Sequence, residues 1–250
     1  VTELQHDSIG IFAELDYMIT DRTKLTFGAR WTEENKEVIF NAIGSCEKDF
    51  SSCSGPSSGL FRSGTYDDTT PKFAITHALN DDVNIYASYT QGFRSGSFDA
   101  RARTIDSFLN SQPGPEEVTS IELGLKSTLN DGRIMFNLAV FQADYDDIQK
   151  LALEECVVNT TTCPSGRIQR LINAAEATIE GIEIETRINI TDQFSLEGSL
   201  GYTDASFDKF EGFDADGVRG YDPVTDPAAA KALKFERVPE LTYNIMAVSY

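Results

Sequence analysis

Apolar and polar residues alternate in repeated segments along this chain of 250 residues. The clearest case is residues 182–190 and 194–203, where most isoleucine, leucine and aromatic residues fall on every second position, with charged or small residues between them. A period of two predicts β-strands with one apolar face and one polar face. We expect about nine such strands. The other segments with this pattern are residues 8–19, 24–32, 73–79, 83–94, 119–126, 134–140 and about 238–250.

Four similar phrases lie between pairs of these segments. They are Ile-Thr-Asp at 19–21, Leu-Asn-Asp at 79–81, Leu-Asn-Asp-Gly at 129–132 and Ile-Thr-Asp at 190–192. Asn, Asp and Gly favour tight turns, so each phrase predicts a hairpin. The segments between the hairpins are long and polar. This asymmetry is typical of an all-β, antiparallel up-and-down transmembrane barrel with short periplasmic turns and long extracellular loops.

The last long loop, residues 207–237, carries several acidic residues. Within it, Asp226 and Pro227 have the residue types of a helix N-terminus, so a short helix is expected there and nowhere else.

The strand pattern fixes which face meets lipid. No apolar run approaches the length of roughly 18 residues that a transmembrane helix requires. In a barrel strand only every second residue meets lipid, and an Arg placed there at the midplane costs about 2–4 kcal/mol. We therefore expect the isoleucines of residues 182–190 to point outward. The charges expected to face the lumen are Glu14, Asp16, Arg30, Glu122, Lys126, Glu183, Glu185, Arg187 and Glu197.

The assignment of faces leads to one prediction of ion pairs and leaves one strand ambiguous. Opposite charges on neighbouring strands predict that Glu14 and Asp16 lie near Lys24 and Arg30. The segment 134–145 fits two phases equally well, because its odd and even positions are both apolar, and a register bulge or a buried two-sided strand would explain it.

Composition and net charge argue against some classes of binding partner. The net charge of −19 and the pI near 4.4 argue against nucleic acid, because phosphates would be repelled. A hydrophobic content of 40% excludes a disordered acidic tail. The acidic loops can also attract cationic or metal-chelate ligands by long-range steering, although acidic surfaces are equally a means of solubility.

The four cysteines form two pairs with identical spacing, Cys46 with Cys53 and Cys156 with Cys163. Both pairs lie in expected loops, and neither loop contains a His, so a zinc site is disfavoured. We predict two loop disulfides and hence an oxidising compartment such as the periplasm or cell exterior.

No motif indicates catalysis. The sequence lacks G-x-S-x-G, H-E-x-x-H and P-loop patterns, and its two histidines, His6 and His77, are isolated. We expect no enzyme activity, no catalytic residues, no cofactor and no metal site.

Five stretches resemble a known family. Residues Tyr86–Phe98 read Tyr-Ala-Ser-Tyr-Thr-Gln-Gly-Phe-Arg-Ser-Gly-Ser-Phe; the others are Leu25–Arg30, Glu116–Lys126, Phe141–Ile148 and Val238–Tyr243. In this order and at these spacings they resemble the barrel of TonB-dependent outer-membrane receptors, over essentially the whole chain.

The resemblance implies a 22-stranded barrel closed by an N-terminal plug, driven by the inner-membrane TonB complex and located in the outer membrane of a Gram-negative bacterium. Such receptors import iron-siderophores, cobalamin, carbohydrates or similar scarce nutrients. Residues 1–250 would be part of the single barrel domain, because neither a plug, a TonB box nor the C-terminal strands are identified. The implied partners are outer-membrane lipid, the protein's own plug, the TonB complex through regions absent here, and a small-molecule nutrient.

Two weak ligand candidates, Tyr89 and Arg94, lie in the most family-like stretch, although a structural role at the strand end, beside the flexible Gly92 and Gly96, is favoured over binding. The specific ligand is not indicated. Alternative functions are a passive outer-membrane porin, which would lack a plug, and a secreted β-sandwich adhesin, which would need no detergent for extraction.

Overall fold

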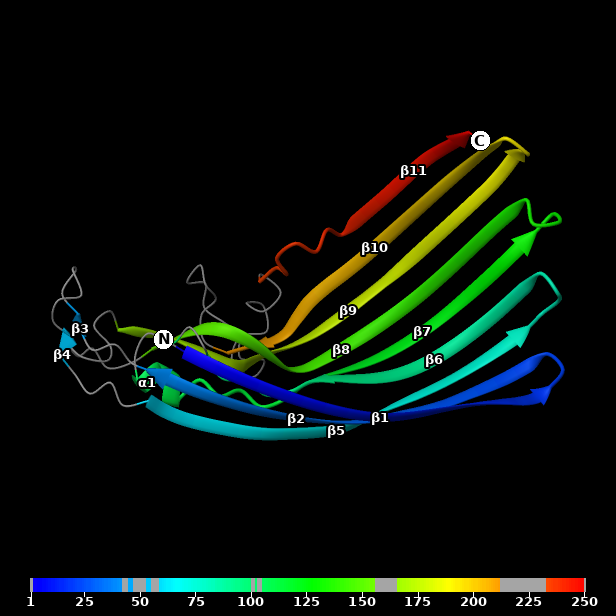
Figure 1. Ribbon diagram of the computed structural model, residues 1–250. Helices are drawn as coiled ribbons and strands as arrows, with labels where there is room; N and C mark the ends of the chain where they lie inside the picture. Colours follow the sequence, from blue (N-terminus) through cyan, green and yellow to red (C-terminus); the bar gives the residue numbers. More distant parts are fainter. Residues whose placement is uncertain are drawn as a thin grey trace.

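The computed structural model describes residues 2–41, 45–46, 53–54, 59–99, 102, 105–155, 166–211 and 233–249. Nine strands form one antiparallel sheet in the order β1-β2-β5-β6-β7-β8-β9-β10-β11 (Figure 1). Their bounds are β1 Thr2–Thr20, β2 Thr23–Asn41, β5 Gly59–Ala78, β6 Val83–Arg94, β7 Glu116–Leu129, β8 Ile134–Glu155, β9 Arg167–Thr191, β10 Phe194–Phe210 and β11 Leu241–Ser249. The sheet order follows the chain, so the prediction of nine up-and-down strands is confirmed.

Two smaller elements were not expected. Strands β3 (Ser45–Cys46) and β4 (Cys53–Ser54) form a separate pair, and helix α1 (Ile105–Leu109) lies in the loop between β6 and β7. The prediction of no helix outside the last loop is therefore wrong. The segment after Asp226 lies outside the described residues. Among the described residues, no helix is long and apolar enough to cross a membrane.

Several strands are longer than the alternating pattern predicts. β5 begins at Gly59 rather than near Phe73, and it pairs with β2 along its whole length. The added residues 59–72 are rich in Ser, Thr and Asp, so an apolar period was absent from this part of the strand. Backbone pairing with β2, rather than an apolar face, defines this extension.

The four tight turns form where they were predicted, and a polar side chain closes three of them. In these turns the middle residue of the phrase accepts a hydrogen bond from the backbone N–H two residues on, as is common for Thr and Asn. The bonds are Arg22 N to Thr20 Oγ1 at 3.2 Å, Asp82 N to Asn80 Oδ1 at 2.9 Å and Gln193 N to Thr191 Oγ1 at 3.2 Å. In the remaining turn, between β7 and β8, Asn130, Asp131 and Gly132 all have positive φ, of 56°, 54° and 82°.

One face of the sheet is a continuous apolar surface. Register partners connect a single apolar row across all nine strands. The row is Tyr17, Leu25, Ile75, Ala87, Leu123, Val140, Ile182, Tyr202 and Leu241. The isoleucines of β9 belong to this face, as predicted.

Strand β8 takes the phase that places Val140 on the apolar face and Phe141 on the opposite one. Phe141 lies directly across from Gly181, and a Cβ at Gly181 would lie 2.8 Å from Phe141 Cζ. The sequence could not decide the phase, because Phe141 is as apolar as Val140. Residues 134–145 pair with both neighbouring strands without a register shift, so a bulge is not what explains their ambiguous pattern. A bulge lies further along, between Tyr145 and Gln149, where Asp147 has φ of 54°.

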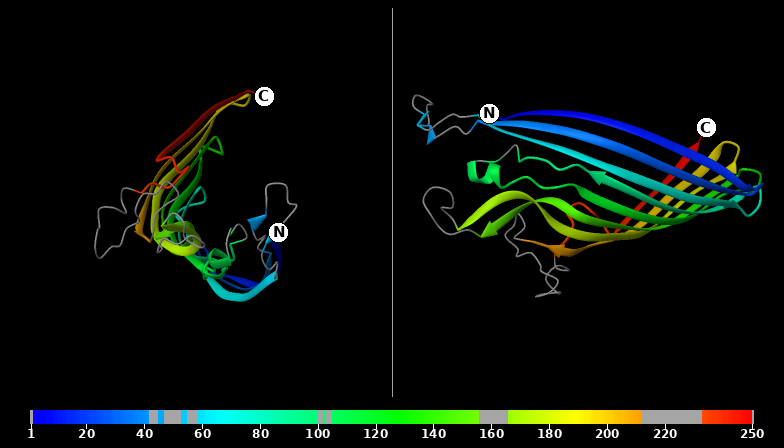
Figure 2. Two further views of the ribbon diagram at one scale, coloured as in Figure 1. Left: turned by 90° about the vertical axis from the view of Figure 1, so that its left-hand side faces the viewer. Right: turned by 90° about the horizontal axis from the view of Figure 1, so that it is seen from below.

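Seen along the strands, the sheet bends into an open trough, with α1 on its concave side (Figure 2). The loop that carries α1 contacts Lys36 and Val38, which alternate with the apolar positions of β2. The concave face therefore carries the polar positions, and we call it the inner face. The apolar row lies on the convex, outer face.

The sheet divides at Pro71. Pairing of β5 with β6 starts at Lys72 with Thr90, beside Pro71, which has no backbone N–H to donate. Beyond this point β6 continues beside β7 alone, up to Arg94, while β5 continues beside β2. The loop between β6 and β7 joins these two parts of the wall.

Candidate functional site

The inner face carries the nine charged residues predicted to face the lumen, each of which alternates with the outer apolar positions of its strand. Some form ion pairs across strands. Lys24 Nζ lies 3.1 Å from Asp16 Oδ2, as predicted, whereas Glu14 pairs at 2.8 Å with Lys72 of the third strand in the sheet. The expected pairing of Arg30 with these acids is not made, because Arg30 Nε donates to Thr32 Oγ1 at 3.0 Å.

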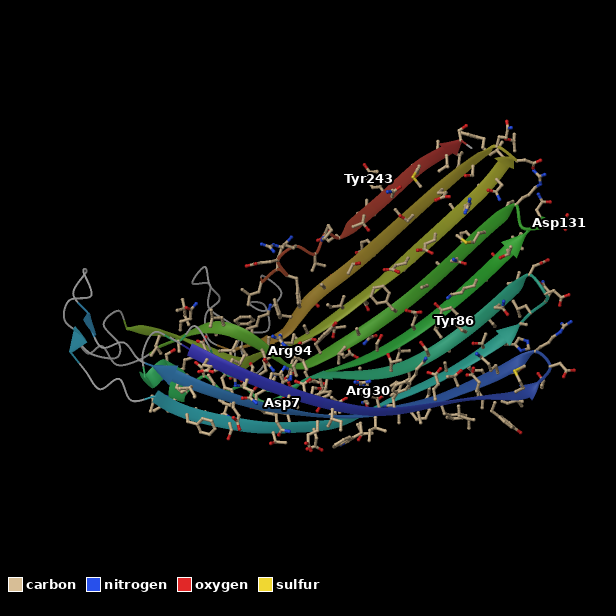
Figure 3. The ribbon with its side chains drawn as sticks, in the orientation of Figure 1. Asp7, Arg30, Tyr86, Arg94, Asp131 and Tyr243 are labelled. Atoms are coloured by element: carbon tan, nitrogen blue, oxygen red, sulfur yellow. The ribbon has the colours of Figure 1, made fainter. Side chains whose placement is uncertain are left out.

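A second charge cluster lies midway along the strands. Tyr86 Oη donates to Glu122 Oε1 at 2.6 Å, and Lys126 Nζ lies 5.5 Å from the centre of the Tyr86 ring. These residues line a small recess of about 200 Å³ together with Glu183 and Glu185. Figure 3 shows Tyr86 in this central part of the wall. Sequence reasoning missed Tyr86, although the glycine at 124 opposite it was a signal for a large neighbour.

At the long-loop end, residues 95–99, 102 and 105–115 lie over the inner face, and we call this part of the chain the inner loop. Lys36 Nζ donates to Ser95 Oγ at 2.5 Å and to Gly96 O at 2.9 Å. Ser95 in turn donates to Glu34, which also lies 3.0 Å from His6 Nε2. One end of the loop is thus attached to β2 through charge-assisted hydrogen bonds, which are the stronger kind, and His6 of β1 contacts the same Glu34.

Gln149, at the β8 bulge, holds the two ends of the inner loop together. Its Nε2 donates to Ser95 O at 2.9 Å and to Gly114 O at 3.0 Å, and its Oε1 accepts from Ser97 at 2.9 Å. Asn173 of β9 adds a hydrogen bond from Gly114 N at 2.7 Å. The side chain of Gln149 is buried, so each of these bonds would be costly to lose.

The loop also has a small apolar core. Phe108 of α1 and Val38 of β2 are both fully buried, and Phe98 packs with them. Five of the nine buried polar residues among the described part of the chain, Ser95, Asp99, Ser107, Ser111 and Gln149, belong to the loop or contact it. The inner loop is therefore a packed element of the wall.

Glu34 is held ionised by this arrangement. Partial burial alone would raise its pKa, but the hydrogen bond from Ser95 and the charges of Lys36 and His6 outweigh it, so the pKa lies below the ordinary value of a glutamate. The neighbours of Glu34 on the outer side, Glu33 and Asn35, are polar, so this site lies beyond the apolar surface.

The two ligand candidates lie on different faces. Tyr89 is on the outer face, with its ring 6.2 Å from that of Phe73. Arg94 is on the inner face at the base of the inner loop (Figure 3), with its side chain 66% exposed and Nη1 3.8 Å from Glu116 Oε2. Of the two, Arg94 alone faces the interior of the trough.

The cysteines are only partly described. Cys46 and Cys53 are directly opposite each other in β3 and β4, a backbone arrangement within reach of a disulfide. Cys156 and Cys163 lie outside the described residues. Both disulfides stay predictions. No group of His, Cys, Asp or Glu in the described ranges has the arrangement of a metal site.

The sequence matches the family "TonB dependent receptor-like, beta-barrel" over residues 2–250. The chain belongs to this family. Members of this TonB-dependent receptor family are proteins of the Gram-negative outer membrane, which agrees with the apolar outer face and polar inner face. The predicted fold class is confirmed, whereas the total strand count of the barrel is untested.

Solved TonB-dependent receptors have the same fold. The siderophore receptor PiuA from Acinetobacter baumannii covers 99% of this chain with a TM-score of 0.71 at 17% identity. The ferric-catecholate import receptor Fiu from K12 E. coli covers 98% with a TM-score of 0.64 at 18% identity. In sequence, the metal-pseudopaline receptor CntO of Pseudomonas aeruginosa is 26% identical over 143 residues, or 57% of this chain.

This chain spans only part of these receptors. It covers 17% of the CntO sequence and 32% of the chains of PiuA and Fiu. Because the sequence identity to these solved structures is only 17–18%, their similarity to this chain shows a shared fold and nothing more.

Proposed function

We propose that these residues are the barrel wall of a receptor that takes up a scarce nutrient across the outer membrane, gated by a plug and energised by the TonB complex. The observation that carries the proposal is the two-faced wall: an apolar outer row across all nine strands, and a charged inner face with a packed inner loop at the end of the long loops. A wall of this kind suits a lipid-embedded barrel with a polar interior.

The ligand class favoured is a chelated metal. PiuA and Fiu are described as siderophore and ferric-catecholate receptors, and CntO as a metal-pseudopaline receptor. Cobalamin and carbohydrates remain alternatives. We propose that Arg94 contributes to binding, because its guanidinium is exposed on the inner face, only loosely paired with Glu116, and able to donate to the oxygens of a chelate.

The proposal is tested by uptake in a strain that lacks the complete gene. We expect import of one labelled metal chelate to be lost and then restored by the full-length gene, but not in a strain that also lacks TonB. Uptake that is independent of TonB would favour the passive porin instead. If none of the tested chelates, cobalamins or glycans depended on the gene, the transport function would be rejected.

Arg94 is tested in the restored strain. We expect Arg94→Ala to weaken binding of the identified chelate by roughly 10- to 150-fold, since a charge-assisted bond of about 1.5–3 kcal/mol is lost, and Arg94→Lys to keep part of the affinity. Arg22→Ala, at a tight turn far from the inner loop, is the matched control. Equal affinities of Arg94→Ala and the control would remove Arg94 from the binding site.

A further inference from the structure

The outer face changes from apolar to acidic toward the long-loop end. On strands β1, β2 and β5 to β10 the apolar outer positions end at one residue, and the next two outer positions are polar apart from Phe93. None of these positions holds Lys, Arg or His, and all but one of the strands carry a carboxylate there. We call these carboxylates the acidic belt. They are Asp7 of β1, Glu33 of β2, Asp67 of β5, Glu117 of β7, Asp144 of β8, Glu180 of β9 and Asp204 of β10.

Within the belt, acids lie directly opposite other acids on neighbouring strands. The register pairs are Glu33 with Asp67, Glu180 with Asp204, and Glu117 with Asp146, the next outer residue of β8. Like charges that face each other across two strands destabilise the pairing. Asp67, Glu180 and Asp204 are exposed, so a group outside the wall can reach them.

The basic residues of the strands do not compensate this charge. Lys24, Lys72 and Arg187 each pair with an acid of the inner face. In the described part of the chain, no Lys or Arg forms an ion pair with a carboxylate of the belt. The belt acids, which come from separate strands, also do not form a metal site within the described ranges. The compensating charge therefore comes from outside the wall, and from a surface rather than from one coordinated ion.

The belt lies at the level of the lipid headgroups when the apolar outer positions lie in the hydrocarbon, as the proposed function requires. Two residues of a strand span about 7 Å, or about 5 Å along the membrane normal at a tilt near 45°. The headgroup layer on each side of the hydrocarbon is about 5–7 Å thick. Asp7, Glu33, Glu180 and Asp204 are the first outer residues beyond the apolar positions, so they fall within this layer. Figure 3 shows Asp7 toward the long-loop end of the wall.

We propose that the acidic belt binds outer-leaflet lipid headgroups that carry a cationic amine. An ammonium group donates charge-assisted hydrogen bonds to carboxylates, and it screens two acids that face each other. A headgroup whose only charge is a phosphate is repelled by the belt. The inference rests on the proposed function in taking the outer face to be embedded in lipid.

Vesicle composition tests this on the full-length receptor. The receptor is folded into phosphatidylcholine vesicles that also contain either phosphatidylethanolamine or phosphatidylglycerol, which share a phosphate, although only ethanolamine carries an ammonium group. At low salt we expect the equilibrium constant of unfolding in urea to be about tenfold smaller with ethanolamine, because a lipid that binds the folded state stabilises it. High salt should reduce this advantage. Equal constants in the two kinds of vesicle would overturn the proposal.

Neutral variants assign the advantage to the belt. Glu33→Gln combined with Glu180→Gln removes one acid from each of two facing pairs, and it should reduce the advantage of ethanolamine to less than about threefold. Asp21→Asn combined with Asp81→Asn is the control, because it makes the same change of charge at two exposed tight-turn residues. The control should keep the full advantage. An advantage of the same size in both double variants would reject the belt as the binding surface.

Magnesium distinguishes the amine from a bridging metal ion. We expect Mg²⁺ to leave the unfolding constant in ethanolamine vesicles unchanged. If phosphatidylglycerol with Mg²⁺ stabilised the receptor as much as ethanolamine, and only while the belt acids were present, a divalent cation would replace the amine and the proposal would be rejected. Equal stability in all vesicles together with TonB-dependent uptake rejects only this inference, whereas a receptor that folds into none of them contradicts the lipid-embedded wall itself.

Discussion

At the scale of single residues, two glycines of the inner face lie directly opposite a large aromatic side chain of the neighbouring strand. Gly124 is directly opposite Tyr86, and a Cβ at 124 would lie 2.3 Å from the Tyr86 ring. Gly181 has the same relation to Phe141. The missing side chain lets the aromatic ring lie flat on the neighbouring backbone, where Tyr86 reaches Glu122. Each pair thereby fixes the register of two strands.

Gly124→Ala is expected to destabilise the full-length receptor by about 1–3 kcal/mol, because the new methyl group displaces the Tyr86 ring. Urea-dependent unfolding in detergent micelles measures this. Gly198→Ala is the matched control, since its Cβ would have only ordinary contacts at 3.6 Å. Adding Tyr86→Leu to Gly124→Ala should recover part of the loss; a loss equal to that of the control would contradict the overlap.

Glu34 gives a pH prediction at the same scale. Its folded-state pKa is lowered, so its contribution to holding the inner loop is present above the pKa of the unfolded state and is lost as the pH falls through the folded value. Amide hydrogen exchange in residues 95–115, corrected for the intrinsic pH dependence, should therefore show less protection below about pH 4 than at pH 7. Glu34→Gln should lower the protection at pH 7 and remove most of this pH dependence, whereas Glu33→Gln, on the outer side, should change neither.

At the scale of elements, the inner loop has a small packed core of its own, separate from the larger apolar cluster around Phe207 and Phe210. It fills the position where β5 and β6 separate beside Pro71, and its contacts come from β2, β5, β8 and β9. A loop held by buried polar bonds and a buried phenylalanine stays in place on the inner face. These contacts hold the described residues of the loop against the inner face at the long-loop end of the sheet.

Gln149→Ala tests this attachment. The change leaves the carbonyls of Ser95 and Gly114 without a partner, and each costs about 1–3 kcal/mol when buried. We expect residues 95–115 to exchange amide hydrogens at least tenfold faster, while β10 and β11 are unaffected. Gln142→Ala is the control, because Gln142 lies on the outer face and, among the described contacts, hydrogen-bonds only to the half-buried Asp144. Equal exchange in both variants would mean that Gln149 does not hold the loop.

At the scale of the whole molecule, the two faces divide the side chains by polarity. The outer row is apolar on all nine strands, while the ion pairs of Asp16 and Glu14 and the Tyr86 cluster lie inside. In a lipid-embedded barrel this division is the main constraint on substitution.

Ile184→Arg, on the outer face, is expected to destabilise the receptor in lipid vesicles by about 2–4 kcal/mol. Ser199→Arg, on the adjacent strand but on the inner face and opposite Glu185, should change stability far less. Folding titrations in vesicles measure both variants. A similar loss for the two would contradict the assignment of the faces.

Local pattern predicted much of the fold. Side chains of a strand alternate whatever its partners are, so the faces of β9 and β10 followed from residues 182–203. The turn phrases were sufficient because a Thr or Asn closes its own turn within two residues. The Asp16 pair with Lys24 followed as well, since a tight turn fixes which residues of its two strands are opposite.

Contacts between distant segments were not predictable in this way. Neither residues 59–72 nor the inner loop has an alternating pattern. Backbone pairing with β2 places residues 59–72, and hydrogen bonds of Gln149 and Asn173, many residues away in the sequence, place the loop. The phase of β8 was decided by Gly181 on the next strand, which only the assembled sheet places under Phe141. The sequence by itself determined strands, turns and faces, which are local properties. Only the tertiary structure decided the inner loop and the recess beside Tyr86, because both are formed by side chains that the chain order keeps apart.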